Sequence, residues 1–219
     1  YSSAASDVYK RQGLDQTICA NDSITLSATG ATNYTWNNGV TNGIAFSPSS
    51  TQTYTVSGVD QNNCSNTDQV HVTVLALPIV NAGIDQTTCL GTAVVLNATG
   101  ANSLSWNNGI TNGLYFTPTF TQSYVVTGID ANNCVNTDEV LITVNSLPII
   151  SAGDDQTICL GVSITLSATG GINYQWNNGV TNGNSFIPTA TQSYIASGSD
   201  INGCSNSDTV IVTVIDCTG

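Results

Sequence analysis

Residues 36–43 read Trp-Asn-Asn-Gly-Val-Thr-Asn-Gly, and this block decides the fold. It recurs as WNNGITNG at residues 106–113 and as WNNGVTNG at residues 176–183, so the spacing is 70 residues both times. Self-similarity at a fixed period indicates a tandem array in which each copy is one structural unit. Each block holds two Asn-Gly pairs, which predict tight turns because both residue types tolerate a positive φ.

Short β-strands are predicted on both sides of the block. Apolar and hydroxyl residues alternate with a period of two, which indicates strands with one buried and one solvated face. The alternating stretches of the first copy are 23–28, 34–36, 53–57 and 70–74. Its aromatic core is predicted to contain Tyr34, Trp36, Phe46 and Tyr54. We therefore expect an all-β chain of three small two-sheet sandwich modules of 70 residues each, arranged as an elongated rod on the order of 100 Å long.

Two Leu-Pro pairs mark the joints between the modules. Proline lacks a backbone donor and restricts the residue before it, so Leu77-Pro78 and Leu147-Pro148 predict short, semi-rigid linkers. The predicted modules are repeat 1 (13–78), repeat 2 (79–148) and repeat 3 (149–219). The leader, residues 1–12, matches nothing at the equivalent positions and contains both basic residues of the chain. We interpret it as a tag or an artefact and exclude it.

The composition excludes several classes of function. The chain has 2 basic and 14 acidic residues, a net charge of −12, so it lacks the cations that nucleic-acid phosphates or an anionic membrane surface require. No apolar run is long enough to insert into a membrane. The single histidine, His71, is expected to face solvent, and without a second histidine the serines have no conventional base. We expect no enzymatic activity.

The cysteines indicate an oxidising, extracellular compartment. Six of the seven recur in strict register with the repeat, and a module of 70 residues is marginal without a cross-link. We expect one disulfide inside each repeat. The expected pairs are Cys19–Cys64, Cys89–Cys134 and Cys159–Cys204.

Other roles for the cysteines fit less well. A pairing of Cys64 with Cys89 across a joint would require the chain to fold back at a proline-stiffened linker. Zinc binding lacks the usual C-x-x-C spacing. Cys217 has no counterpart, since Leu77 and Leu147 occupy its register position, so we expect it to pair outside the array or to belong to a neighbouring domain.

The order of motifs resembles a known family. The motifs are AG-x-DQTxC-x-G (82–91 and 152–161), L-x-ATG (26–30), Y-x-W (34–36), T-x-S/T-Y (51–54), and D-x-N-x-C followed by a valine-rich strand. Together they resemble the Ig-like, PKD-like repeats of large surface and secreted proteins of the Bacteroidota, the kind exported by the type IX secretion system. The resemblance implies an Ig-like fold, a spacer or adhesive stalk, and no catalytic residues. The family's turn often carries an Asp that is missing after Trp36.

Calcium is the strongest chemical alternative, because each repeat places oxygen ligands around its second cysteine. If the expected disulfides form, Asp15 and its copies would lie close to these ligands. The candidate ligands are Asp60, Asn62, Asp68, Asp130, Asn132, Asp138, Asp200, Asn202 and Asp208. Turn residues of this type also cap backbone donors without any metal.

Two functions remain. The first is a non-catalytic extracellular spacer or stalk in a large secreted or surface-anchored adhesin-type protein, joined to neighbouring domains of the same polypeptide. The second is binding of an extracellular glycan or protein by the repeats themselves, through their turns or the threonine-rich solvated face. We expect the tryptophans to be core residues rather than sugar-stacking platforms.

Overall fold

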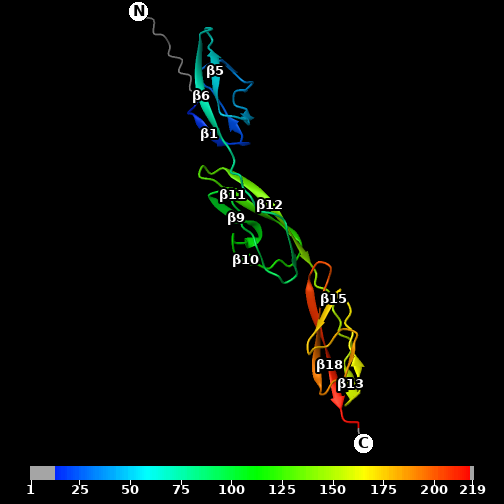
Figure 1. Cartoon of the computed structure of the whole chain (residues 1–219). Coiled ribbons are helices and arrows are strands. Elements are labelled where there is room, and N and C mark those ends of the chain that lie inside the picture. Colours follow the sequence, from blue (N-terminus) through cyan, green and yellow to red (C-terminus); the bar gives the residue numbers. More distant parts are fainter. Residues whose placement is uncertain (1–12, 218–219) are drawn as a thin grey trace, which may run out of the picture. The chain divides into compact units, whose positions relative to one another are not determined.

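The computed structural model describes residues 13–217, and the expectations for the leader fall outside this range (Figure 1). Each repeat forms six strands. Repeat 1 contains β1 (Gln16–Cys19), β2 (Ile24–Thr25), β3 (Asn33–Trp36), β4 (Ala45–Phe46), β5 (Gln52–Val59) and β6 (Ser65–Leu75). Repeat 2 contains β7 (Gln86–Cys89), β8 (Val94–Val95), β9 (Ser103–Trp106), the 3-10 turn η1 (Asn107–Gly109), β10 (Tyr115–Phe116), β11 (Gln122–Ile129) and β12 (Val135–Asn145). Repeat 3 contains β13 (Gln156–Cys159), β14 (Ile164–Thr165), β15 (Asn173–Trp176), β16 (Ser185–Phe186), β17 (Gln192–Ser199) and β18 (Ser205–Ile215).

The strands of each repeat form two sheets, as the alternating pattern predicts. The larger sheet of repeat 1 has the order β1-β6-β5-β3, and the smaller one pairs β2 with β4. Repeats 2 and 3 have the same order. The chain is therefore all-β, with three repeated β-sandwich units.

One strand pair in each repeat is parallel. The first strand pairs with the second half of the last strand, so that Gln16 lies opposite Val72 and Cys19 opposite Leu75. The long hairpin of β5 and β6 is antiparallel. The first-strand cysteine therefore lies at the carboxyl end of the last strand of its own repeat.

The core of each repeat is built from the alternating residues. In repeat 1, Leu26, Val56, Val70 and Val72 have no exposed surface. Of the four aromatic residues predicted for this core, Trp36 and Tyr54 are buried, while Tyr34 and Phe46 are partly buried and pack against the cluster. Phe46 and Tyr54 meet edge to face at a centroid distance of 5.2 Å. The predicted core is confirmed.

The recurrent block forms a turn that closes the core. Asn38 and Gly39 both have positive φ, 55° and 73°, as expected of an Asn-Gly turn. Asn42 turns its side chain inward, where its Oδ1 accepts hydrogen bonds from the indole N–H of Trp36 at 3.1 Å and from the backbone N–H of Ala28 at 2.7 Å. The asparagine thus satisfies two donors that the core would otherwise leave without a partner.

Packing divides the chain into two compact units whose border runs through repeat 2. The first comprises residues 13–82, 98–107 and 125–138, and the second comprises 83–97, 108–124 and 139–217. Within residues 13–217, no helix has the length and apolar character that a membrane span requires.

Candidate functional site: the joints between consecutive repeats

The disulfides connect successive repeats instead of closing each repeat on itself. Cys19 of repeat 1 bonds to Cys134 of repeat 2, and Cys89 of repeat 2 bonds to Cys204 of repeat 3. The Cα–Cα distance is 5.5 Å in both pairs. The expected pairing within each repeat, Cys19–Cys64, Cys89–Cys134 and Cys159–Cys204, is therefore wrong.

The parallel pairing of β1 with β6 explains the difference. Cys19 lies beside Leu75 at the carboxyl end of β6, whereas Cys64 immediately precedes Ser65 at its amino end. A strand of this length separates the two cysteines by roughly 35 Å. Disulfides need Cα atoms within about 7 Å. The first-strand cysteine reaches instead the hairpin turn of the next repeat.

The last repeat ends the series differently. Cys159 bonds to Cys217, which lies two residues beyond β18. The expectation that Cys217 pairs outside the array or belongs to a neighbouring domain is therefore wrong. Cys217 occupies the position of Leu77 and Leu147, next to the end of the last strand, where the first-strand cysteine of its own repeat is within reach.

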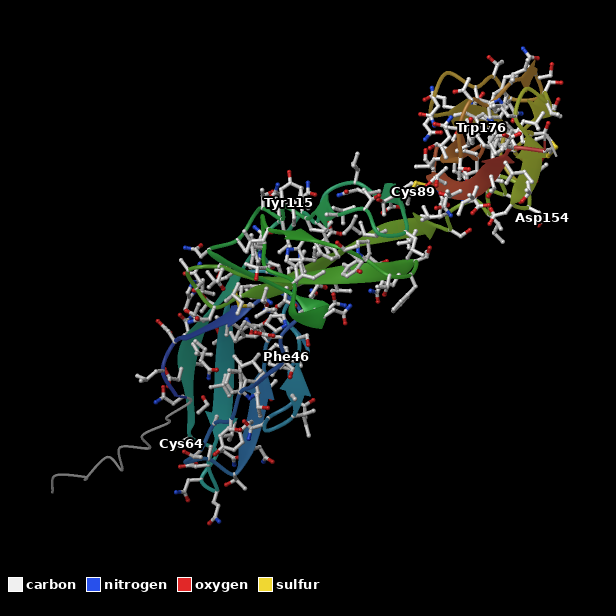
Figure 2. The ribbon with its side chains drawn as sticks, turned by 90° about the horizontal axis from the view of Figure 1, so that it is seen from below. Phe46, Cys64, Cys89, Tyr115, Asp154 and Trp176 are labelled. Atoms are coloured by element: carbon white, nitrogen blue, oxygen red, sulfur yellow. A yellow bond between two sulfur atoms is a disulfide. The ribbon has the colours of Figure 1, made fainter. Side chains whose placement is uncertain are left out.

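Burial separates the hairpin cysteines into two kinds. Cys134 and Cys204, which are bonded to the preceding repeat, have no exposed surface. Cys64, at the same position in repeat 1, is an exposed free thiol (Figure 2). The prediction that placed Cys64 in a disulfide is thus contradicted within this chain.

Each linker is fixed to the repeat that follows it. At the first joint, the amide of Asn136 donates to the carbonyl of Pro78 at 2.9 Å, and the backbone N–H of Ala82 donates to Asp138 at 2.8 Å. At the second joint, the equivalent bonds are Asn206 to Pro148 at 3.0 Å and Ala152 to Asp208 at 2.9 Å. The two joints therefore have the same hydrogen bonds as well as the same disulfide.

At each of the two joints, a glycine of the following repeat lets the linker backbone approach. A Cβ at Gly100 would lie 1.8 Å from the carbonyl oxygen of Ile79, and one at Gly170 would lie equally close to that of Ile149. Both glycines have a positive φ, 97° and 90°. On β11, Gly128 similarly makes room for the side chain of Val80. The linker is therefore packed against the sandwich as well as hydrogen-bonded to it.

One carboxylate that holds the second linker, Asp208 on β18, has a shifted pKa. The backbone N–H groups of Ala152 and Thr209 donate to Asp208 and hold its pKa below the ordinary value of 3.8, against a smaller effect of desolvation. Hydrogen bonds to a carboxylate favour its charged form. Ionised Asp208 is therefore the form that fits the second joint.

The carboxylates proposed as calcium ligands contact backbone N–H groups at separate places. Asp60 accepts from the N–H groups of Asn62 and Cys64, both at 2.8 Å, within the hairpin turn. Asp15 instead accepts from His71 on β6. The disulfide that was to bring these groups together does not form. In the described part of the chain, no three His, Cys, Asp or Glu side chains are placed to hold a metal ion.

The remaining candidates take the positions expected for structural residues. His71 is exposed, with its ring nitrogen 3.2 Å from the hydroxyl of Thr53. Trp36 and Trp106 are buried, and Trp176 is half-buried. The buried tryptophans offer no open face on which a sugar ring could stack. The joint is therefore the distinctive feature of the described chain.

One residue of the sequence, Cys217, is a signal for this site. The replacement of leucine by Cys217 in the third copy places a cysteine next to the end of the last strand. Such a cysteine can pair with Cys159 only if the first strand also ends there. The substitution therefore carried information on strand direction.

Comparisons with known proteins find similarity only among solved structures. No protein-family model and no curated protein matches the chain. Immunoglobulin domains 1–4 of Sidekick-1 are 15% identical over 95% of this chain and 76% of that chain, with a TM-score of 0.31. The insect immune protein hemolin is 13% identical over 94% and 76%, with a TM-score of 0.35. The I9–I11 tandem of titin is 15% identical over 94% and 98%, with a TM-score of 0.33. Similarities this low carry no information on function.

Proposed function

We propose that this chain is a non-catalytic extracellular spacer in which disulfides cross-link consecutive repeats, so that it resists lengthening under tension. The observation that carries the proposal is the pair of disulfides that connect consecutive repeats, Cys19–Cys134 and Cys89–Cys204. Each joint thus has two covalent connections, the linker backbone and a disulfide. Three disulfides also fit an oxidising compartment. The resemblance of the motifs to secreted Bacteroidota repeats supports the same location.

The disulfides determine which residues carry a pulling force. A force applied at residues 13 and 217 follows the shortest covalent path, which runs through residues 13–19, crosses to Cys134, continues to Cys159 and crosses to Cys217. Residues 20–133 and 160–216 are bypassed. The path contains 34 residues, which span at most roughly 120 Å when fully extended.

Unfolding can add little length to this path. More than half of its residues already lie in the extended strands β1, β12 and β13. Without disulfides, the same ends would be joined by about 205 residues, with a contour length of roughly 700 Å. The cross-links therefore remove most of the length that unfolding would otherwise release.

Single-molecule pulling from residues 13 and 217 tests the spacer. The oxidised chain should show no lengthening step as large as the unfolding of one repeat, roughly 200 Å for 70 residues. After reduction, steps of that size should appear. Substituting Cys89 and Cys204 together by serine is the matched control, because this disulfide lies off the shortest path. Its loss should leave the maximum end-to-end extension of the oxidised chain unchanged. A full repeat step in the oxidised wild type contradicts the proposal.

Binding by the repeats is the second candidate, and one observation favours it in repeat 2. Leu114, Tyr115 and Phe120 are exposed to 61%, 77% and 59%. The same positions hold smaller or polar residues in at least one other copy, such as Ala45 and Ser50. Exposed aromatic groups of this kind occur at sites for proteins or glycans. Figure 2 labels Tyr115 on β10.

A binding assay distinguishes the second function from the first. The chain is tested on a glycan array and against extracellular matrix proteins, beside a variant with Tyr115→Ala and Phe120→Ser. Saturable binding that the variant loses supports a binding role for repeat 2. Binding that both chains share, or no binding by either, contradicts it.

A further inference from the structure

We infer that Cys64 is the covalent acceptor for the first-strand cysteine of a further repeat of this kind. Its counterparts Cys134 and Cys204 occupy the same hairpin position and are both bonded to such a cysteine. They are buried by that contact, whereas Cys64 is exposed. The bonded partners of Cys134 and Cys204 therefore indicate which kind of cysteine would bond to Cys64.

The local structure of repeat 1 matches that of the occupied copies. The N–H of Cys64 donates to Asp60 at 2.8 Å, as that of Cys134 does to Asp130 at 2.9 Å. Asn63 and Asn133 both have positive φ, 58° and 65°. The hairpin turn that presents the thiol is therefore the same with and without a bonded partner.

Repeat 1 also carries the residues that receive a linker. Gly30 has a φ of 91°, close to the 97° of Gly100, where the linker carbonyl of Ile79 packs. Asn66 and Asp68 stand where Asn136 and Asp138 hold the first linker. These features are independent of the cysteine and indicate the same occupant, a repeat with its linker.

A second copy of this chain does not supply that cysteine. Its three first-strand cysteines, Cys19, Cys89 and Cys159, are all consumed in disulfides. Cys217 is bonded to Cys159, so the first-strand cysteine of repeat 3 has no free thiol to offer Cys64. Cys64 therefore needs a further repeat with an unpaired first-strand cysteine.

The bond would add a second covalent path along the chain. The first path, described above, contains residues 134–159. The second would enter at Cys64, follow the backbone to Cys89 and cross the disulfide to Cys204. Forming the new bond joins the two sulfur atoms and releases two protons. The two electrons pass to a disulfide oxidant such as oxidised glutathione, which is reduced to two thiols.

The test adds one repeat to the full array. Residues 83–152 are joined directly ahead of Gly13 in place of the leader, so that the copy of Cys89 lies 115 residues before Cys64, the separation found at both existing joints. The protein is oxidised with glutathione disulfide, alkylated, and cleaved with chymotrypsin, since the repeats lack lysine and arginine. Peptide mapping then identifies the partner of Cys64.

The expected result is a disulfide between Cys64 and the added copy of Cys89, with loss of alkylation at Cys64. When the added copy of Cys89 is replaced by serine, Cys64 should be alkylated again. A second version carries residues 13–82 as the added repeat, which guards against a donor that fails to fold. Cys64 alkylated in both versions, while the three existing disulfides form, overturns the inference. The pulling experiment does not involve Cys64, so the two proposals can fail separately.

Discussion

The indole N–H of Trp36 donates to the side-chain oxygen of Asn42 at 3.1 Å, and this bond links the first and seventh residues of the recurrent block. Trp176 and Asn182 repeat it at 3.0 Å. A buried indole needs an acceptor, and a short turn that returns an asparagine to the core supplies one. The block is therefore a structural unit in which the turn and the core depend on each other.

Replacing Asn42 by alanine should destabilise repeat 1 by roughly 2–3 kcal/mol, because two buried donors lose their partner. Denaturant unfolding followed by hydrogen exchange measures the loss and assigns it to a repeat. Asn62→Ala is the matched control, since that asparagine is exposed in the same repeat and should tolerate the change. Equal effects of the two substitutions would refute the role of Asn42.

Replacing Gly100 by alanine should cost at least about 2 kcal/mol, since left-handed backbone strain is added to a clash with Ile79. Thermal unfolding measures the effect. Gly109→Ala separates the two causes, because Gly109 also has a positive φ but has open space where its Cβ would be. That variant should lose only about 1 kcal/mol. If Gly100→Ala costs no more than the control, the linker does not press against the glycine.

Alkylation of the native, unreduced protein should add one label, at Cys64. The reason is that the other six cysteines are bonded in pairs. Intact mass gives the number of labels, and peptide mapping gives their position. A Cys64→Ser variant should take no label. A label on Cys217 would restore the pairing within repeats that the sequence alone suggested.

The strands and the core followed from the sequence because their causes are local. Alternation places Val56, Val70 and Val72 on one face, and Asn38-Gly39 sets the turn geometry. These patterns need no knowledge of which strands become neighbours. The sandwich and its aromatic core could therefore be predicted.

The six cysteines in register do not by themselves predict the disulfide pairing, because the pairing depends on a contact between strands far apart in sequence, and only Cys217 carries a signal for that contact. Cysteines in register show that each repeat has two equivalent positions, but not which end of the sandwich each one occupies. The parallel pairing of Gln16–Cys19 with the end of β6 separates Cys19 from Cys64. The alternative of a calcium site assumed the same contact where it placed Asp15 beside the ligands near Cys64, and the disulfide that would join these groups does not form.

Acid should weaken the second joint through Asp208. Its pKa is lowered in the folded state by the N–H groups of Ala152 and Thr209, so the folded chain favours the ionised form more than the unfolded chain does. The resulting stabilisation is present above the ordinary value of 3.8 and is lost as the pH falls from there through the lower folded pKa. The effect is small, because the side chain of Asp208 is only half-buried and solvent screens its charge.

The test compares Asp208→Asn with the wild type by thermal unfolding between pH 7 and pH 2.5. The asparagine retains an acceptor for Ala152 but has no charge to titrate, so the variant should be less stable than the wild type at neutral pH. This difference should shrink as acid protonates Asp208 in the wild type. Asp154→Asn serves as the control, because Asp154 is an exposed aspartate just before β13 in the same repeat, and in this variant stability should still depend on pH as it does in the wild type. A stability difference between Asp208→Asn and the wild type that stays constant over the whole range would show that the charge of Asp208 does not stabilise the joint.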